Sequence, residues 1–327
     1  MSSAPTLLDT LCGRGASCQA ARGGDLFVDS SVHIGRAFHI PRFVIGGTLV
    51  SLATTTPELV VSVTASVIGD SGIAVGNAIG SCICNIGLIV GMVALITSVT
   101  VDQRDFANRA KWMVGAAVLV VLLSWDRTLV RPMGVLLVVL ALTYLWWDYR
   151  AIRRARAQRS QRPPGETAIN DVGPIRGSVL AFAFGAGLII VGSRLLVSSG
   201  QSVAAALGIP SAIIGFSVVA VGTSLPELVT GVAAARKGVP DLSLGNIVGA
   251  NVLNLFLIVG LSGSIRPLTL DAFTQWYAFP WMGTFFAALI ILIRRNGMVE
   301  SKAGVGLLVL YILYLVGLIG LPALGLT

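Results

Sequence analysis

The stretch GGTLVSLATTTPELVVSVTAS (residues 46–66) returns 169 residues later as GFSVVAVGTSLPELVTGVAAA (residues 215–235). The two copies align without a gap, and each carries a Pro-Glu step, which ends on Glu58 in the first and on Glu227 in the second. Both steps lie inside stretches apolar enough to span a bilayer, where an ionisable residue is costly and marks a functional site by default. A pair of such sites in duplicated halves predicts a secondary transporter that binds its substrate near the bilayer midplane.

A second part follows in each copy, GNAIGSCICNIGLIVG (residues 76–91) and GNIVGANVLNLFLIVG (residues 245–260). Glycines four residues apart in both segments favour close helix packing. The asparagines of the two segments stand eight residues apart, near one helical face, as Asn77 and Asn85 in the first and Asn246 and Asn254 in the second. We expect each of these helices to press its amides against the broken helix of its own repeat.

The composition is that of a polytopic all-α membrane protein. Of the 327 residues 55% are hydrophobic and only 12% are charged, with a mean hydropathy of +0.85, whereas soluble domains carry about 25% charged residues. The net charge of +8 comes from short connections between apolar stretches. Basic loops that face an anionic lipid leaflet explain it better than a nucleic-acid partner.

Nine stretches are interpreted as membrane segments, for which a spanning helix needs about 20 apolar residues; one of them, 112–125, is short. They lie near 42–68, 73–98, 112–125, 130–148, 177–199, 211–235, 243–264, 276–293 and 304–322. The segment between the halves is rich in arginine and is broken by Pro-Pro-Gly, so we interpret residues 150–176 as a solvated linker.

Basic residues set the orientation, because Lys and Arg accumulate in cytoplasmic loops. The linker carries Arg150, Arg153, Arg154, Arg156, Arg159 and Arg162 and is predicted to be cytoplasmic. Counting outward, the inside connections hold Arg104, Arg109, Lys111, Arg236, Lys237, Arg294, Arg295 and Lys302, and the outside ones only Arg127, Arg131 and Arg266. The connection before the first repeat then falls inside and that before the second, near 200–210, outside, so the repeats are inverted.

The halves are expected to hold five helices each, with the first helix of the first half missing or degraded. The 169-residue offset places that helix at about 8–30, but the sequence there is polar, and the match between the halves ends upstream of Gly23. We therefore divide the chain into a stretch without a counterpart (1–22), a first half (23–149, repeat at about 40–98), the linker (150–176) and a second half (177–327, repeat at about 209–264). A wrong start or a frame slip in the gene explains residues 1–22 better than a true loss of the helix.

The proline breaks predict a cation site made of oxygen ligands. Proline has no N–H and clashes with the preceding turn, so it leaves carbonyls near Leu52–Thr54 and Val221–Thr223 without helical partners. In hydrocarbon these groups must be satisfied, and a bound cation can do so. Neutral oxygens come from Thr54, Thr55, Thr223 and Ser224, and anionic oxygens come from Glu58 and Glu227. Such a set matches Ca²⁺ or Na⁺ rather than a transition metal.

These motifs resemble the repeats of the cation/calcium exchanger superfamily, G-[TS]-S-x-P-E followed by G-N-x-x-G-S-N-x-x-[ND], and in particular its prokaryotic sodium/calcium exchanger branch. The resemblance runs from about Gly23 to the C-terminus. It implies ten transmembrane helices in two inverted halves of five, with four cation sites at the centre.

The resemblance also implies a ligand set, position by position. It comprises Ser51, Thr54, Thr55, Glu58, Ser81 and Asn85 in the first repeat and Ala220, Thr223, Ser224, Glu227 and Asn254 in the second. Ser51 and Ala220 stand where the family uses backbone carbonyls. The chain departs from the pattern at Ala250, where Ser is usual, and at Asn254, where several members have Asp.

Together the residues and the resemblance favour an antiporter of the cell inner membrane that exchanges Ca²⁺ for Na⁺, not an enzyme. We expect a monomeric unit in the lipid bilayer with no cofactor beyond the transported ions and no nucleic-acid partner. A Ca²⁺/H⁺ antiporter is the alternative, because protons could neutralise the same glutamates. A passive channel fits one closed central site poorly, and an intramembrane hydrolase would need an activated nucleophile that the motifs do not contain.

Overall fold

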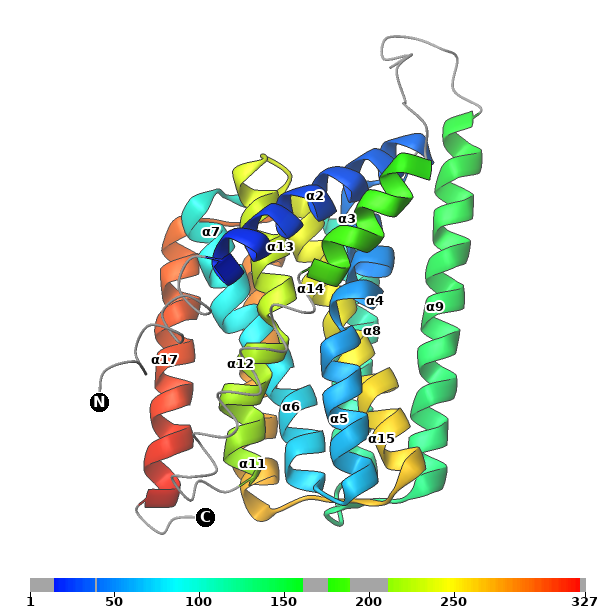
Figure 1. The fold of residues 1–327 in the computed structure, drawn as a ribbon. Helices are drawn as coiled ribbons and strands as arrows, with labels where there is room; N and C mark the ends of the chain where they lie inside the picture. The colour runs from blue at the N-terminus through cyan, green and yellow to red at the C-terminus, as the bar shows by residue number, and fades with distance from the viewer. Residues whose placement is uncertain (1–14, 39, 161–175, 189–210, 324–327) are drawn as a thin grey trace, which may run out of the picture.

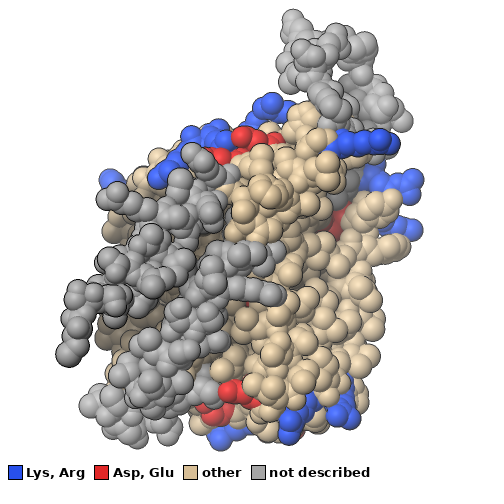
Figure 2. All heavy atoms as spheres, viewed as in Figure 1, with Lys and Arg blue, Asp and Glu red and all other residues tan. Residues whose placement is uncertain are grey.

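The computed structural model describes residues 15–38, 40–160, 176–188 and 211–323, which form a bundle of helices (Figure 1). Six helices in this part of the chain are long and apolar enough to cross a membrane, and two bent helix pairs bring the number to eight. On the face shown in Figure 2, Lys and Arg gather at the two ends of the bundle, and the band between them carries almost no charge. The chain is therefore a multi-pass helical membrane protein, as its composition predicts.

In the first half, α2 (Gly15–Ala37) precedes the broken helix. The elements that follow are α3 (Arg42–Ile45), η1 (Gly46–Val50), α4 (Ser51–Thr54), α5 (Thr56–Ile68), α6 (Ser71–Cys84), η2 (Asn85–Val90), α7 (Gly91–Ile96), β1 (Val99–Thr100), α8 (Gln103–Leu123), β2 (Thr128–Leu129) and α9 (Arg131–Ser160). The η elements are π-helical turns.

The second half is described from the helix Arg176–Leu188 and again from residue 211. Its elements are α11 (Ser211–Ile214), η3 (Gly215–Val219), α12 (Ala220–Thr223), α13 (Leu225–Arg236), α14 (Pro240–Leu253), η4 (Asn254–Ile258), α15 (Val259–Ile265), β3 (Leu268–Thr269), η5 (Thr274–Ala278), α16 (Phe279–Asn296), β4 (Met298–Val299) and α17 (Ser301–Ala323).

The two repeats have the same local structure at the 169-residue offset. The π-turns η1 and η3 begin at Gly46 and Gly215, and η2 and η4 begin at Asn85 and Asn254. Single π-turns inside α-helices are rare and cluster at functional sites. The duplicated sequence thus specifies the same four-part pattern twice, and each copy consists of a broken helix followed by a helix with its own π-turn.

Two short ribbons show that the halves are related by inversion. β1 pairs antiparallel with β4, and β2 pairs antiparallel with β3, so each ribbon joins one half to the other. β1 precedes α8 and β2 follows it, and α8 has 21 residues, a length of about 30 Å. β1 and β3 occupy equivalent places in the two halves, as do β2 and β4. The β1–β4 and β3–β2 pairs are thus equivalent and lie at opposite ends of the bundle, as an inverted repeat requires.

Eight of the nine predicted membrane segments correspond to these helices or bent pairs. The ninth, 177–199, begins as the helix Arg176–Leu188, and the rest of it and the 200–210 connection lie outside the described residues. The segment predicted at 112–125 was placed too late, because α8 begins at Gln103 with Asp102 as its cap. Arg109 and Lys111, which we assigned to an inside connection, are therefore residues of the helix.

The region predicted to have lost its membrane-spanning helix forms α2, a polar helix that we did not predict from the sequence. One face of α2 packs against the bundle. Its residues Phe27 and Val28 are buried in one cluster with Ala233 and Ala234 of α13. The Phe27 ring stacks on Phe182 at 4.5 Å between centroids. As predicted from its polar sequence, α2 is not among the helices apolar enough to span a membrane. Residues 1–14 lie outside the described part of the chain.

The segment interpreted as a solvated linker starts as helix. α9 continues to Ser160, and residues 161–175 lie outside the described residues. Asp148, two residues before the first arginine of this run, Arg150, is fully buried. The sequence placed the beginning of the linker too early because charged residues can extend a helix past the apolar span.

The centre of the bundle is made of small residues at helix crossings. A Cβ on Gly80 of α6 would lie 2.8 Å from the carbonyl oxygen of Phe216 and from the Cβ of Ala220. α14 packs in the same way on η1, with Gly249 against Gly47. Glycine at these positions lets each amide-bearing helix press against the broken helix of the opposite repeat.

Candidate functional site

Both broken helices bend where the sequence places the proline. The two parts of the first helix meet at 43° and those of the second at 48°. The residues at the breaks, Thr55 and Ser224, have ψ values of 2° and 7° and so leave helical geometry. Pro57 and Pro226 occupy the first turn of the helix that follows, where a missing N–H is tolerated. Each break therefore opens a helix N-terminus inside the bundle.

Glu58 and Glu227 lie in the first turns of α5 and α13 and are fully buried. Ser224 donates a hydrogen bond to one carboxylate oxygen of Glu58 over 3.2 Å, which joins the two repeats. The other oxygen of Glu58 and both oxygens of Glu227 have no hydrogen-bond donor among the described residues. Buried acceptors without donors are costly, and a cation would satisfy them.

Hydroxyl and carbonyl oxygens surround the breaks. Thr55 donates to the carbonyl of Ser51 over 2.6 Å, and Thr54 reaches the same carbonyl over 3.5 Å. In the second repeat Thr223 donates to the Ala220 carbonyl over 3.4 Å. Each repeat thus brings hydroxyls and one backbone carbonyl to a single turn, and all of these are hard oxygen ligands.

The amides of α6 and α14 cross between the repeats. Thr54 donates to the amide oxygen of Asn246 over 3.1 Å, and Thr223 donates to that of Asn77 over 2.8 Å. Asn77 also donates from its nitrogen to the Glu58 carbonyl over 3.1 Å. The expectation that each amide helix serves its own repeat is therefore incomplete, because its oxygen holds the threonine of the other repeat.

The remaining predicted ligands lie one to two turns further along these helices. Ser81 is 3.5 Å from the carbonyl of Ala220. Asn85 donates to the side-chain oxygen of Asn251 over 3.0 Å, while the oxygen of Asn85 has no partner in the described structure. Asn254 is fully buried, and neither of its amide atoms has a hydrogen-bond partner there.

The structure buries every residue of the predicted ligand set, with at most 4% of any of them exposed. The set is Ser51, Thr54, Thr55, Glu58, Ser81, Asn85, Ala220, Thr223, Ser224, Glu227 and Asn254. Asn251 was missed, because the equivalent position in the first repeat is Cys82 and the repeat comparison gives it no weight. Asn77 and Asn246 were noted for their spacing, but not as partners of the opposite threonines.

An all-helical membrane bundle of two inverted repeats, each with a buried carboxylate at a helix break, has the architecture of a secondary transporter. The sequence model of the family described as sodium/calcium exchanger protein matches residues 20–150 and 177–320. The chain therefore belongs to the sodium/calcium exchanger family, a family of cation and Ca²⁺ exchangers, and the resemblance of its motifs is confirmed.

Similar proteins cover most of the chain. The sodium/calcium exchanger MaX1 of Methanosarcina acetivorans is 31% identical over 324 residues, which is 89% of this chain and 93% of that protein. The inner membrane protein YrbG of Escherichia coli K12 is 34% identical over 278 residues, 84% of each. A solved structure of the sodium-calcium exchanger NCX_Mj, soaked with Na⁺ and Sr²⁺, has a TM-score of 0.73 at 30% identity and covers 91% of this chain and 94% of that one.

Proposed function

We propose that the protein is an antiporter that exchanges Ca²⁺ for Na⁺ by alternating access at one central site. The observation that carries the proposal is the pair of buried carboxylates, Glu58 and Glu227, of which three oxygens have no hydrogen-bond donor in the described structure. Two anionic groups in a low-dielectric interior need compensating positive charge. One divalent ion or several monovalent ions supply it.

The ligands that we propose are the carboxylates of Glu58 and Glu227, joined by neutral oxygens from both repeats. Thr54, Thr55, Thr223 and Ser224 would contribute hydroxyls, Ser51 and Ala220 backbone carbonyls, and Ser81, Asn85 and Asn254 the side chains of the neighbouring helices. Ca²⁺ takes six to eight oxygen ligands, which this set can provide. The same oxygens divided among smaller groups suit Na⁺.

Competition for the carboxylates would make the exchange obligatory. An empty site leaves two buried charges uncompensated, so the change between inward-facing and outward-facing states is favourable only when cations are bound. Inversion of the repeats gives the two states similar geometry, because each half can adopt the conformation of the other. Relatives named as sodium/calcium exchangers support this assignment.

The second candidate is a Ca²⁺/H⁺ antiporter. The oxygens of Glu227 that lack donors would be neutralised equally well by protons. The hydroxyls and amides around them favour Na⁺, since a proton needs only the carboxylate and gains nothing from a neutral oxygen cage. The second repeat offers one side-chain oxygen fewer for Na⁺ than the first, because Ala250 stands where the first repeat has Ser81.

Uptake of ⁴⁵Ca²⁺ into proteoliposomes distinguishes these candidates. Vesicles loaded with Na⁺ and diluted into Na⁺-free buffer at equal pH should accumulate ⁴⁵Ca²⁺, whereas vesicles loaded with choline and given a pH gradient should not. Accumulation driven by the pH gradient alone would replace the first proposal with the second. Equilibration without accumulation under either gradient would indicate a channel.

We further propose that the protein resides in the cell inner membrane as a monomeric unit, with the central linker in the cytoplasm and no cofactor besides the transported ions. The arginines from Arg150 onward support this orientation through the positive-inside rule. A single cysteine introduced at Ser160 in a variant without the native cysteines tests the orientation. An impermeant maleimide should label it in inverted vesicles and not in right-side-out cells.

A further inference from the structure

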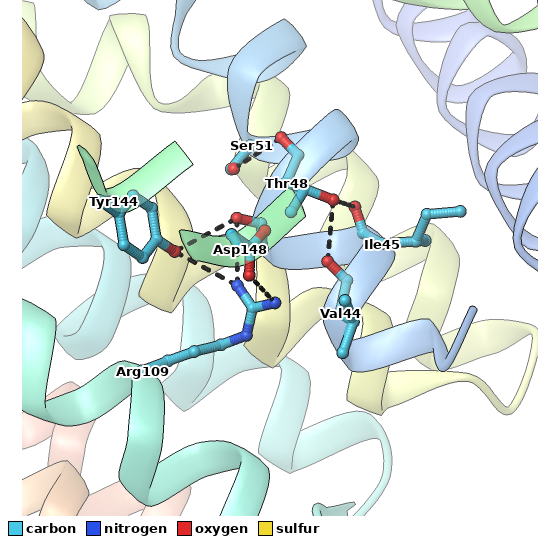
Figure 3. Close-up of polar contacts among 8 residues, drawn as sticks. Val44, Ile45, Thr48, Ser51, Arg109, Tyr144 and Asp148 are labelled. Atoms are coloured by element: carbon cyan, nitrogen blue, oxygen red, sulfur yellow. Dashed lines mark hydrogen bonds and ion pairs between the residues drawn. The ribbon is translucent and has the colours of Figure 1, made fainter. Parts of the chain in front are cut away.

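An ion pair is buried beside the first broken helix, outside the proposed ligand set. Arg109 of α8 contacts the carboxylate of Asp148 of α9, with only 3% and 0% of the two side chains exposed. The guanidinium also donates to the hydroxyl of Tyr144 over 3.2 Å and to the carbonyl of Gly47 over 3.4 Å. Figure 3 shows Arg109 between Tyr144 and Asp148. The guanidinium carbon also lies over the Phe43 ring, 5.6 Å from its centroid. Nothing in the proposed exchange cycle uses this charge.

The cluster holds the π-turn that leads into the proposed ligands. Gly47 lies in η1, and the Tyr144 hydroxyl donates to the same carbonyl over 3.5 Å. Thr48, the next residue, accepts from the Ser51 hydroxyl over 3.0 Å at its carbonyl (Figure 3). The Ser51 carbonyl in turn accepts from Thr55. A short path of contacts therefore links the ion pair to two proposed ligands of the first repeat.

Among the described residues, the second half has the same tyrosine contact but no counterpart of the Arg109–Asp148 ion pair. Tyr314 donates to the carbonyl of Phe216, the counterpart of Gly47, over 3.3 Å. The position equivalent to Arg109 at the 169-residue offset is Ala278. The buried stripe Leu137, Ala141, Tyr144 and Asp148 of α9 matches Leu307, Tyr311, Tyr314 and Leu318 of α17, so leucine occupies the position of Asp148.

The second half shows that this helix crossing can pack without an ion pair. The same helix crossing closes in the second half around alanine and leucine, both fully buried. Replacing a buried ion pair with apolar side chains is often neutral or stabilising, whereas removal of one partner is strongly destabilising. Packing alone therefore does not explain two buried charges at this crossing. The hydrogen bond from Arg109 to the Gly47 carbonyl does explain them, because the donor of this bond is a charged guanidinium.

We propose that Arg109 and Asp148 are positioning residues for the first-repeat cation ligands. Asp148 orients the guanidinium, and Arg109 together with Tyr144 fixes the carbonyl of Gly47 and hence the turn that presents Ser51 and Thr55. The first repeat thus holds its ligands more rigidly than the second, where Tyr314 acts without a charged partner. The inference rests on the proposed function, because it concerns the affinity of that cation site.

The test exchanges the pair for the residues of the other half. The double variant Arg109→Ala/Asp148→Leu is purified at full length, and two quantities are measured: the unfolding temperature without Ca²⁺, and the dissociation constant for ⁴⁵Ca²⁺ at equilibrium without Na⁺. The control is Lys237→Ala/Asp29→Leu, which removes an exposed ion pair of 2.8 Å between Lys237, the residue that caps the C-terminus of α13, and Asp29 of α2.

We expect the double variant to unfold near the wild-type temperature and to bind ⁴⁵Ca²⁺ about tenfold more weakly, the usual scale for loss of a partner that orients a ligand. The control should leave the dissociation constant unchanged. A lower unfolding temperature with an unchanged dissociation constant would show that the pair is only structural, and would overturn the proposal.

Two further outcomes are informative. If the double variant fails to fold, the pair is needed for packing. The single variant Arg109→Lys then tests whether Arg109 also positions the ligands. Lysine keeps the charge beside Asp148 but lacks the planar fork that also reaches Gly47, so it should weaken ⁴⁵Ca²⁺ binding severalfold. Wild-type affinity in Arg109→Lys would overturn the proposal. Absence of ⁴⁵Ca²⁺ binding by the wild-type protein would instead refute the proposed function, and this inference with it.

Discussion

The hydroxyl of Thr54 lies 3.1 Å from the amide oxygen of Asn246, although the two residues belong to different repeats. The reciprocal contact, Thr223 to Asn77, measures 2.8 Å. Each repeat thus supplies the acceptor that orients the central threonine of the other. Neither half therefore supplies the acceptor for its own threonine, and an ion bound between the breaks would contact both halves.

The Thr54–Asn246 hydrogen bond should be energetically coupled to cation binding. Thr54→Ala and Asn246→Ala each remove one end of it, so the double variant should lose less affinity than the sum of the two. The expected coupling is about 1 kcal/mol, the typical net value of a buried hydrogen bond, in a cycle of ⁴⁵Ca²⁺ dissociation constants. A cycle of Thr54→Ala with the exposed Thr284→Ala should be additive. Additivity in both cycles would show that the contact does not support the site.

The matched tyrosines should respond unequally to loss of their hydroxyls. Tyr314→Phe removes the side-chain donor from the Phe216 carbonyl, whereas Tyr144→Phe leaves Arg109 on the Gly47 carbonyl. We expect Tyr314→Phe to weaken ⁴⁵Ca²⁺ binding by about fivefold, which corresponds to about 1 kcal/mol, and Tyr144→Phe to weaken it less. Equal effects would mean that the hydrogen bond from Arg109 does not compensate for loss of the Tyr144 hydroxyl at the Gly47 carbonyl.

Much of the site follows from the sequence because its parts are local. The Pro-Glu steps fix the helix breaks, and the spacing of Thr54, Thr55 and Glu58 places them on one turn. Contacts between the repeats, such as Ser224 with Glu58, follow from inversion only once the helices are assembled. Arg109 shows the limit, since the sequence placed it in a loop. Its burial depends on Asp148, 39 residues later, and no local pattern connects the two.

The substitution Ala250→Ser should strengthen Na⁺ binding by the second repeat. Ala250 is fully buried and equivalent to Ser81, whose hydroxyl lies 3.5 Å from the Ala220 carbonyl. By the same symmetry, the hydroxyl of Ala250→Ser would face the Ser51 carbonyl. The variant should lower the Na⁺ concentration needed for half-maximal Ca²⁺ release, on the scale of about 1 kcal/mol. A changed Ca²⁺ affinity with unaltered Na⁺ dependence would contradict the assignment of this position to Na⁺.

Potassium should be neither required nor carried. Asn254 is a buried neutral amide at the position where the family resemblance implies Asp in several members, so we expect the proposed site to lack a third carboxylate that an added K⁺ would compensate. Addition of K⁺ at a fixed Na⁺ gradient and clamped voltage should leave ⁴⁵Ca²⁺ uptake unchanged. A K⁺ requirement would show that charge is supplied from elsewhere in the chain.

The central claim is that one carboxylate from each repeat forms a single cation site. Its most direct test is Na⁺-driven ⁴⁵Ca²⁺ uptake into proteoliposomes by Glu58→Gln and Glu227→Gln, with the exposed Glu300→Gln as the matched control. Each buried substitution removes one of the two charges that balance Ca²⁺. We predict that both abolish uptake while membrane insertion is retained, and that Glu300→Gln transports like the wild type. Wild-type uptake by either buried variant would contradict the account.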